Sequence, residues 1–395
     1  MRRTITAALA VLLYSLTVTV FAPAAAPAPR YPTPEADPFF HAPADLADHA
    51  PGDVVRQREF HLGPYQGTDI WQVAFRSTNS GGDPIMGITT VLIPAGVVDP
   101  PLVSYQALIN SLGTKCNPSH SLISDETPDA YGAVLPLSRG WAVALPDYLG
   151  PNVAYGAARL SGMVTLDSVR ALQRAPELGL GRSQIALAGY SGGGLATAWA
   201  AAMQPTYAPE LTLAGVAAGG IPADLEQMAL GLGFGNHPGF GLAWAAAMGL
   251  EREYPQRLPI SDQLNGEGLW FRDFTADECR RFLLFHGITR SAEQLAATKS
   301  LMDDPQAREV LRENSLRYYP NLPETPTLFW QGVFDSLTPF DAVADVADRY
   351  CAAGVPITFS RYQIAEHMTT AVVGLPEAWN FLEARFRGEP APTRC

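Results

Sequence analysis

The segment Gly-Tyr-Ser-Gly-Gly at positions 189–193 constrains the fold more than any other part of the chain. The apolar run at 185–188 that precedes it is typical of a buried strand, and the run at 195–202 that follows is typical of a helix. The glycines around Ser191 are small enough to let a strand and a helix pack against a sharp turn. The pattern therefore predicts a tightly turned serine at the start of a helix, where free N–H groups bind anions.

A G-x-S-x-G motif between a strand and a helix is the pattern of the nucleophile elbow in α/β-hydrolases. The motif alone is weak, because short Gly- and Ser-containing matches arise by chance. The alternative is a glycine-rich turn with a solvated serine. The flanking strand and helix favour Ser191 as a nucleophile.

Strand-like and helix-like segments alternate over most of the chain. This rhythm predicts a mostly parallel central sheet with helices on both faces, which is the α/β-hydrolase fold. The rhythm stops near 221, and the sequence to about 321 has a helical pattern, including a predicted helix over 275–285. We expect a core at 38–220 and 322–395, interrupted by an inserted helical cap or lid at 221–321.

The N-terminus carries the signature of export. Arg2 and Arg3 precede an apolar stretch, and small residues follow at 22–24, so residues 1–24 are predicted to be a signal peptide. A retained N-terminal anchor is the alternative. Residues 25–37 are rich in Pro and Ala and are predicted to be an extended leader. The mature protein is expected to be secreted.

Charge and cysteine content limit the partners. The formal net charge is −12, which argues against nucleic acid as a partner, and no further apolar run is long enough for an integral membrane contact. An exported chain with four cysteines suggests two disulfides, with three possible pairings. The pairing with the shortest loops joins Cys116 to Cys279 and Cys351 to Cys395. The spacing of Cys and His predicts no metal site.

A nucleophilic serine needs a base, and the base needs a carboxylate to hold it in the correct tautomer. Asp335 follows the predicted strand at 326–332, and His367 follows the one at 356–362. The chain order Ser, Asp, His is that of α/β-hydrolases. The alternatives are a helix-capping role for Asp335 and a local hydrogen bond for His367. The backbone N–H of Gly192 is the first expected oxyanion donor, and Asn110 or its neighbours are candidates for the second.

Taken together, the motifs resemble those of secretory lipases of the lipase A type. The resemblance runs through most of the mature chain and includes the segments 37–40, 105–106, 116–119, 146–150, 166–171, 189–193 and 219–224. It implies a triacylglycerol lipase or esterase with a helical cap, a narrow acyl tunnel, no metal and no cofactor. It implies the triad Ser191, Asp335 and His367, and the disulfide pairs 116–279 and 351–395. The family usually has Asp at the oxyanion position where this chain has Asn110, and an amide always carries donors.

The segment 231–241 is too rich in glycine for one rigid helix. It is interpreted either as a mobile lid over an acyl tunnel or as a buried cap with glycine turns. The candidates for substrate contacts around it are Tyr190, Phe234, His237, Phe240 and Trp244. The expected partner is a small-molecule or lipid ester, with a lipid–water interface as a further candidate. The sequence leaves the oligomeric state open.

The sequence thus predicts a secreted serine hydrolase that cleaves carboxylic esters of acyl chains through an acyl-enzyme. An acyltransferase or peptidase on the same triad is the first alternative. A non-catalytic binding protein on a hydrolase scaffold is the second.

Overall fold

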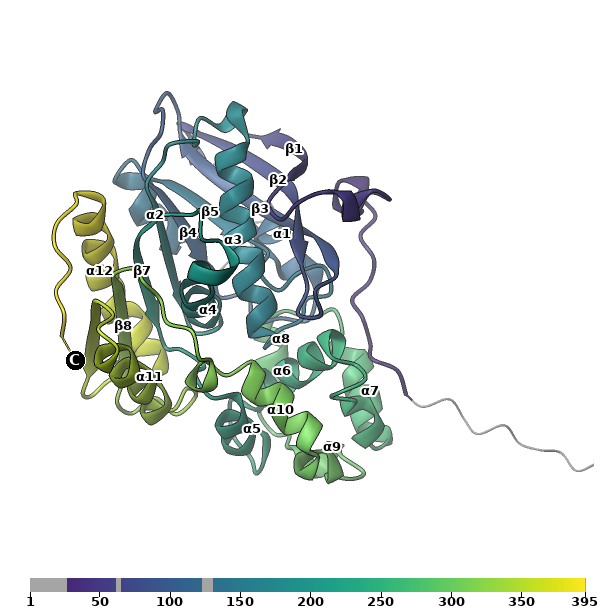
Figure 1. Ribbon diagram of the computed structural model, residues 1–395. Helices are drawn as coiled ribbons and strands as arrows, with labels where there is room; N and C mark the ends of the chain where they lie inside the picture. Colours follow the sequence, from purple (N-terminus) through teal and green to yellow (C-terminus); the bar gives the residue numbers. More distant parts are fainter. Residues whose placement is uncertain (1–26, 62–64, 123–130, 395) are drawn as a thin grey trace, which may run out of the picture.

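The computed structural model describes residues 27–61, 65–122 and 131–394 (Figure 1). The predicted signal peptide at 1–24 lies outside the described residues, as does Cys395. Within the described part, the chain forms one mixed sheet with helices on both faces and a separate group of helices at one end of the sheet.

The sheet has nine strands in the order β1-β2-β3-β5-β4-β6-β7-β8-β9. The first three strands and β5 pair antiparallel, and from β5 to β9 all neighbours are parallel. The parallel part is buried on both faces, which is why its strands read as continuous apolar runs. The strands are β1 (Val54–Phe60), β2 (Thr68–Thr78), β3 (Pro84–Pro94), β4 (Leu102–Gln106), β5 (Ala142–Pro146), β6 (Ile185–Tyr190), β7 (Leu213–Gly219), β8 (Thr327–Gly332) and β9 (Ile357–Tyr362).

Two apolar cores lie on the two faces of this sheet. On one face, Trp199 and Tyr350 are among the fully buried side chains that α3, α4 and α11 pack onto the strands. On the other face, α2 and α12 cover the strands, and Trp379 is fully buried there. These helices are α2 (Tyr131–Ser138), α3 (Ala158–Arg174), α4 (Gly192–Tyr207), α11 (Phe340–Ala352) and α12 (His367–Phe386); a short α1 (Pro118–Ser121) precedes them.

Between β7 and β8 the chain forms a group of helices, here called the helical segment (residues 221–321). It lies below the sheet in Figure 1. Its helices are α5 (Leu225–Gly233), α6 (Phe240–Glu253), α7 (Gly266–Thr275), α8 (Arg280–Gly287), α9 (Ala292–Leu295) and α10 (Pro305–Glu313). The sequence-based prediction of one helix over 275–285 is wrong. Instead, α7 ends at Thr275 and α8 begins at Arg280, and residues 276–279 between them contact the loop after β4.

The N-terminal residues lie against the helical segment. Figure 1 shows the purple chain running from the sheet down beside α7. The backbone N–H and side-chain hydroxyl of Thr33 donate to the Asp277 carboxylate at 2.6 and 2.8 Å. Arg272 in α7 donates to the carbonyl of Ala28 at 2.9 Å. The Pro- and Ala-rich stretch is therefore tied to the helices along its described part.

One predicted disulfide is present, and it joins the sheet domain to the helical segment. Cys116 and Cys279 are bonded, with Cα atoms 5.5 Å apart. Cys351 is also disulfide-bonded, but its predicted partner Cys395 lies outside the described residues, so that pairing stays a prediction. No helix in the described ranges is both long and apolar enough to span a bilayer.

Candidate active site

Ser191 lies at the turn between β6 and α4. Its backbone has φ 55° and ψ −120°, a conformation that costs energy for any residue except glycine. The turn is held because the Ser191 N–H donates to the carbonyl of Gly219 at 2.9 Å and its own carbonyl accepts from Leu195 at 2.9 Å. Because of this strained turn, the Ser191 side chain lies beyond the carboxyl end of β6, next to the first turn of α4.

His367 is the first residue of α12, which follows the edge strand β9, and its side chain contacts Ser191. Its Nε2 lies 2.9 Å from the Ser191 Oγ, and its Nδ1 lies 2.7 Å from the Asp335 Oδ2. The Tyr190 hydroxyl donates to the His367 carbonyl at 2.5 Å. Burial raises the pKa of Tyr190, so the phenol keeps the proton that makes this bond. Glu366 accepts from the first N–H groups of α12, which fixes the start of the helix and with it the imidazole.

Asp335 follows β8 and is surrounded by donors. Its Oδ1 accepts from the N–H groups of Leu337 and Thr338, each at 2.9 Å, and its Oδ2 also accepts from the Thr338 hydroxyl at 2.8 Å and from Gln331 at 2.9 Å. Burial raises the pKa of this carboxyl, but hydrogen bonds from His367 and Thr338 and the nearby imidazole outweigh it, so the pKa lies below its ordinary value. Asp335 is therefore a carboxylate at neutral pH.

These three side chains come from distant parts of the sequence and form one hydrogen-bonded chain. They are almost wholly buried, with Ser191 6%, Asp335 8% and His367 3% exposed. β6, β8 and β9 are parallel, so the turns that follow them meet at one edge of the sheet. A serine, an imidazole and a carboxylate linked in this order can move a proton from the hydroxyl to the imidazole, whose charge the carboxylate stabilises.

Asn110 lies beside the turn. Its backbone φ is 43°, and its buried side-chain Oδ1 has no hydrogen-bond partner among the described residues. A Cβ added to Gly192 would come within 2.0 Å of this atom, so a larger residue at position 192 would displace the Asn110 side chain. The Asn110 amide and the first N–H of α4 thus lie on the same side of Ser191.

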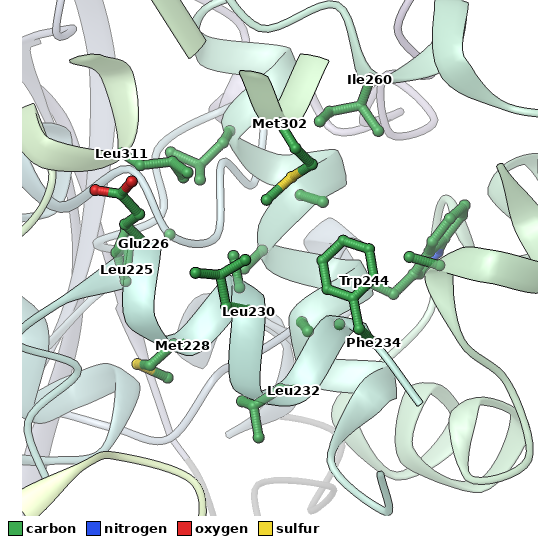
Figure 2. Close-up of a pocket in the computed structure, with 18 of the residues that line it drawn as sticks. Leu225, Glu226, Met228, Leu230, Leu232, Phe234, Trp244, Ile260, Met302 and Leu311 are labelled. Carbon is green, nitrogen blue, oxygen red and sulfur yellow. The ribbon is translucent and has the colours of Figure 1, made fainter. Parts of the chain in front are cut away.

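A largely apolar cavity of about 420 Å³ extends from Ser191 into the helical segment. This volume is typical of a small-molecule binding site. Tyr155 and Leu195 line it near the serine, together with Thr338 from the Asp335 loop. Figure 2 shows side chains from α5, α6 and α10 around it, including Met228, Leu230, Trp244 and Leu311, and Phe234, which follows the last residue of α5.

The sequence-based candidates for substrate contacts divide into two groups. Phe234, Phe240 and Trp244 line the cavity. Tyr190 and His237 do not. Tyr190 is buried against Trp330 and His367, and the His237 Nδ1 accepts from the Gly239 N–H at 2.9 Å. Tyr190 therefore packs against the imidazole of His367, and His237 stabilises the turn at residues 237–239.

Sequence reasoning missed the side chains that surround Asp335. Thr338 and Gln331 both donate to the carboxylate. The pattern Asp-Ser-Leu-Thr at 335–338 carried a usable signal, because an aspartate commonly accepts from main-chain N–H groups two and three residues ahead. Gln331 had no comparable signal, because it is one of several buried residues in β8.

Asp147 and Arg170 are two further buried charged residues, and their contacts are structural. Ser119 donates to Asp147 through its N–H and its hydroxyl, and Arg170 pairs with Asp167 and Glu210. In the described residues, no group of three or more His, Cys, Asp or Glu side chains is placed to hold a metal ion.

Comparison with known proteins gives the family. The secretory lipase family model matches residues 126–393. The chain belongs to the secretory lipase family. It is accordingly a secreted enzyme, a hydrolase of carboxylic esters.

Two relatives are similar over most of their length. Lipase A of Moesziomyces aphidis is 30% identical, with 92% of this chain and 82% of the relative aligned. The secreted triacylglycerol lipase LIP2 of Malassezia furfur is also 30% identical, over the same shares.

Solved structures agree with the fold. The closed state of Candida antarctica lipase A matches with a TM-score of 0.85 and 27% identity, covering 91% of this chain and 87% of that one. The rice cell wall degrading esterase LipA from Xanthomonas oryzae matches with a TM-score of 0.66 and 16% identity, covering 86% of this chain and 97% of that one. At that identity the second match bears on the fold alone. The α/β-hydrolase fold expected from the sequence is confirmed.

Proposed function

We propose that this secretory lipase hydrolyses esters of acyl chains, triacylglycerols among them, with Ser191 as nucleophile, His367 as base and Asp335 as the carboxylate that orients it. The observation that carries the proposal is the unbroken hydrogen-bonded chain from the Ser191 Oγ through His367 to Asp335. The names of the relatives, several of which are secreted triacylglycerol lipases, support the substrate class.

The first half of the reaction acylates the enzyme. The Ser191 Oγ bonds to the ester carbonyl carbon while its proton passes to the His367 Nε2. The negative charge that develops on the carbonyl oxygen is held by the Gly192 N–H and by a donor at Asn110. An amide can present either its oxygen or its NH2, which have nearly the same shape, so a half-turn of the Asn110 side chain supplies that donor. His367 then gives its proton to the leaving alcohol as the carbon–oxygen bond breaks.

The second half releases the acid. Water attacks the acyl carbon while His367 takes one of its protons, and the same proton returns to the Ser191 Oγ as the acyl–serine bond breaks. Asp335 stays ionised throughout, because its lowered pKa favours the carboxylate. Its charge stabilises the imidazolium that forms in each half.

We further propose that residues 221–321 form the cap and that their cavity takes the acyl chain. The cavity begins at Ser191 and is lined mostly by aliphatic and aromatic side chains from the helical segment. Burying an alkyl chain there yields about 0.8 kcal/mol for each methylene removed from water. The cap thereby favours longer acyl chains over acetate.

A lipid–water interface is the proposed setting. Large apolar side chains are exposed next to the triad residues in sequence, and Ile364, three residues before His367, is 95% exposed. Phe334 flanks Asp335, and Met368 and Val372 lie on the first turns of α12; all three are exposed. Such a group of apolar side chains suits contact with a lipid surface.

Replacing the proposed nucleophile tests the function. Ser191→Ala is expected to lower hydrolysis of p-nitrophenyl butyrate by at least about 10⁴-fold, because the covalent route is lost. The matched control is Ser119→Ala. Ser119 also contacts a histidine, His120, and a carboxylate, Asp147, but it does not line the cavity. The control is expected to keep its rate per folded molecule.

Retained turnover in Ser191→Ala would contradict the proposal. For the parent enzyme, assays on esters of increasing chain length, below and above their solubility limit, define the preferred substrate. Parallel assays of peptide cleavage and of acyl transfer to an added alcohol separate the other two uses of the same triad.

A further inference from the structure

Arg252 in α6 is a buried arginine that joins four separate stretches of chain. Only 3% of the surface of this residue is exposed. Its Nη1 donates to the carbonyls of Leu112 at 2.8 Å and Asn152 at 3.0 Å. Its Nη2 donates to the carbonyl of Ala276 and its Nε to that of Arg30, both at 2.8 Å. The guanidinium therefore holds a loop beside Ser191, two other loops and the N-terminal residues in one arrangement.

The acceptors of Arg252 are main-chain carbonyls. Among the residues the structure describes, no carboxylate forms an ion pair with it. Burial lowers the pKa of Arg252 to about 10, so the group is still protonated at neutral pH. A planar fork with five N–H donors can reach carbonyls in several directions at once, whereas a lysine ammonium has three donors on one atom.

The Leu112 carbonyl belongs to the loop that carries Asn110. This loop, residues 107–113, is held on both sides of the asparagine. On one side, the Tyr148 hydroxyl donates to the carbonyl of Ala107 at 2.7 Å. On the other side, Arg252 holds the Leu112 carbonyl, and the Leu112 N–H donates to the carbonyl of Glu278 at 3.0 Å.

Asn110 needs such support. Its φ of 43° lies in the left-handed region, and a residue keeps that conformation only where its surroundings impose it. Its buried side-chain oxygen has no partner in the described part of the chain, so the side chain does not hold the loop by itself. The position of Asn110 is therefore set by its neighbours on either side.

The partner segment of this loop, residues 276–279, is pressed against it. A Cβ added to Gly113 would come within 2.1 Å of the Asp277 carbonyl oxygen, which shows that the two backbones touch. The Cys116–Cys279 disulfide closes the same contact covalently. Arg252 donates to both sides, because it binds Leu112 in the loop and Ala276 in the partner segment.

We infer that Arg252 is a positioning residue for the oxyanion site: it sets Asn110 against Ser191 through the Leu112 carbonyl. The inference rests on the proposed function, in which Asn110 supplies an oxyanion donor. Arg252 does not line the cavity. Its loss should therefore weaken stabilisation of the charged transition state more than it weakens binding of the acyl chain. A displacement of about 1 Å in a catalytic group costs up to about 10²-fold in rate.

Two variants test this role. Arg252→Lys keeps the positive charge but has too few donors for the same carbonyls, and Arg252→Gln removes the charge. Both are expected to lower kcat for p-nitrophenyl butyrate by about 10- to 100-fold, with KM changed less than about threefold. An alkyl boronic acid, whose serine adduct places a tetrahedral oxygen in the oxyanion site, is expected to lose affinity by the same factor as kcat/KM.

The matched control is Arg349→Lys. Arg349 in α11 also donates to two main-chain carbonyls, those of Leu316 and Tyr319 at the end of the helical segment. Its substitution removes a comparable set of hydrogen bonds to main-chain carbonyls but none to the loop that carries Asn110. It is expected to lower the thermal unfolding midpoint while kcat per folded molecule stays within about twofold of the parent.

Three results would overturn the inference. One is an unchanged kcat in folded Arg252→Lys and Arg252→Gln. The second is an equal loss of kcat in the Arg349 control. The third is failure of both Arg252 variants to fold, which would make Arg252 a residue of the fold rather than of the site. The proposed function fails separately, if the parent enzyme does not cleave the ester or if Ser191→Ala still does.

Discussion

At the scale of single residues, the substitution Asp335→Asn tests the carboxylate that orients His367. It accepts five hydrogen bonds and orients the imidazole of His367. Asp335→Asn keeps the shape but cannot hold His367 in the same tautomer. We expect kcat for a soluble ester to fall by about 10³- to 10⁴-fold, with KM nearly unchanged. A loss below tenfold would contradict the role given to this carboxylate.

A second residue-scale prediction concerns Asp147, which lies at the end of β5. Burial raises its pKa to about 6, although hydrogen bonds from Ser119 oppose the shift. An unfolded chain binds this proton with a pKa of about 3.9. Between the two values the folded protein holds a proton that the unfolded chain has lost. The free energy of unfolding contributed by this group therefore falls as pH rises from about 4 to 6 and stays low above that.

Asp147→Asn removes this titration. The free energy of unfolding of the variant, relative to that of the parent, is expected to rise by about 2 kcal/mol between pH 4 and pH 7. Urea unfolding of both proteins at the two pH values measures the difference. If the two proteins respond to pH in parallel, Asp147 is an ordinary carboxylate in the folded state.

At the scale of elements, the Cys116–Cys279 bond closes a loop of 163 residues across the join between sheet and helical segment. A cross-link over so long a loop stabilises the folded chain by about 3–5 kcal/mol. The double variant Cys116→Ser/Cys279→Ser is expected to unfold at a clearly lower temperature. Reduction of the parent with dithiothreitol should move its midpoint toward that of the variant. A parent midpoint unaffected by reduction and equal to that of the variant would contradict this.

The sequence predicted the elements with strong local patterns and missed those set by tertiary contacts. The β6 strand and α4 helix around Ser191 were found because the apolar runs and glycines leave little freedom. The antiparallel strands β1 and β2 were not identified, because their polar and apolar residues alternate less clearly. The break between α7 and α8 was also missed. It depends on contacts of residues 276–279 with the 107–113 loop, which no local pattern encodes.

The candidate site divides in the same way. Ser191, Asp335 and His367 could be named because each follows a recognisable strand in a fixed chain order. Tyr190 was expected near the substrate, yet its hydroxyl lies on the backbone of His367. Arg252 was not singled out, because its role depends on carbonyls distributed over the fold. Side chains that act through main-chain groups leave no motif.

At the scale of the whole molecule, the cavity joins the two parts of the chain. Ala247 in α6 lines it, so Ala247→Phe should fill part of its volume. We expect kcat/KM for a decanoate ester to fall at least about tenfold, because burial of the distal methylenes is lost. Hydrolysis of the acetate ester should change little. The matched control is Ala352→Phe, at an exposed site of α11. Equal losses for both esters would show that the acyl chain lies elsewhere.

The central claim is that the Ser191 hydroxyl, activated by His367 and Asp335, attacks the substrate. The most direct measurement is labelling with a fluorophosphonate, followed by peptide mapping, in the parent, Ser191→Ala and His367→Gln. The account predicts a single label on Ser191 in the parent, none in Ser191→Ala and greatly slowed labelling in His367→Gln. A label mapped to another residue, or labelling of Ser191→Ala at the parent rate, would contradict it.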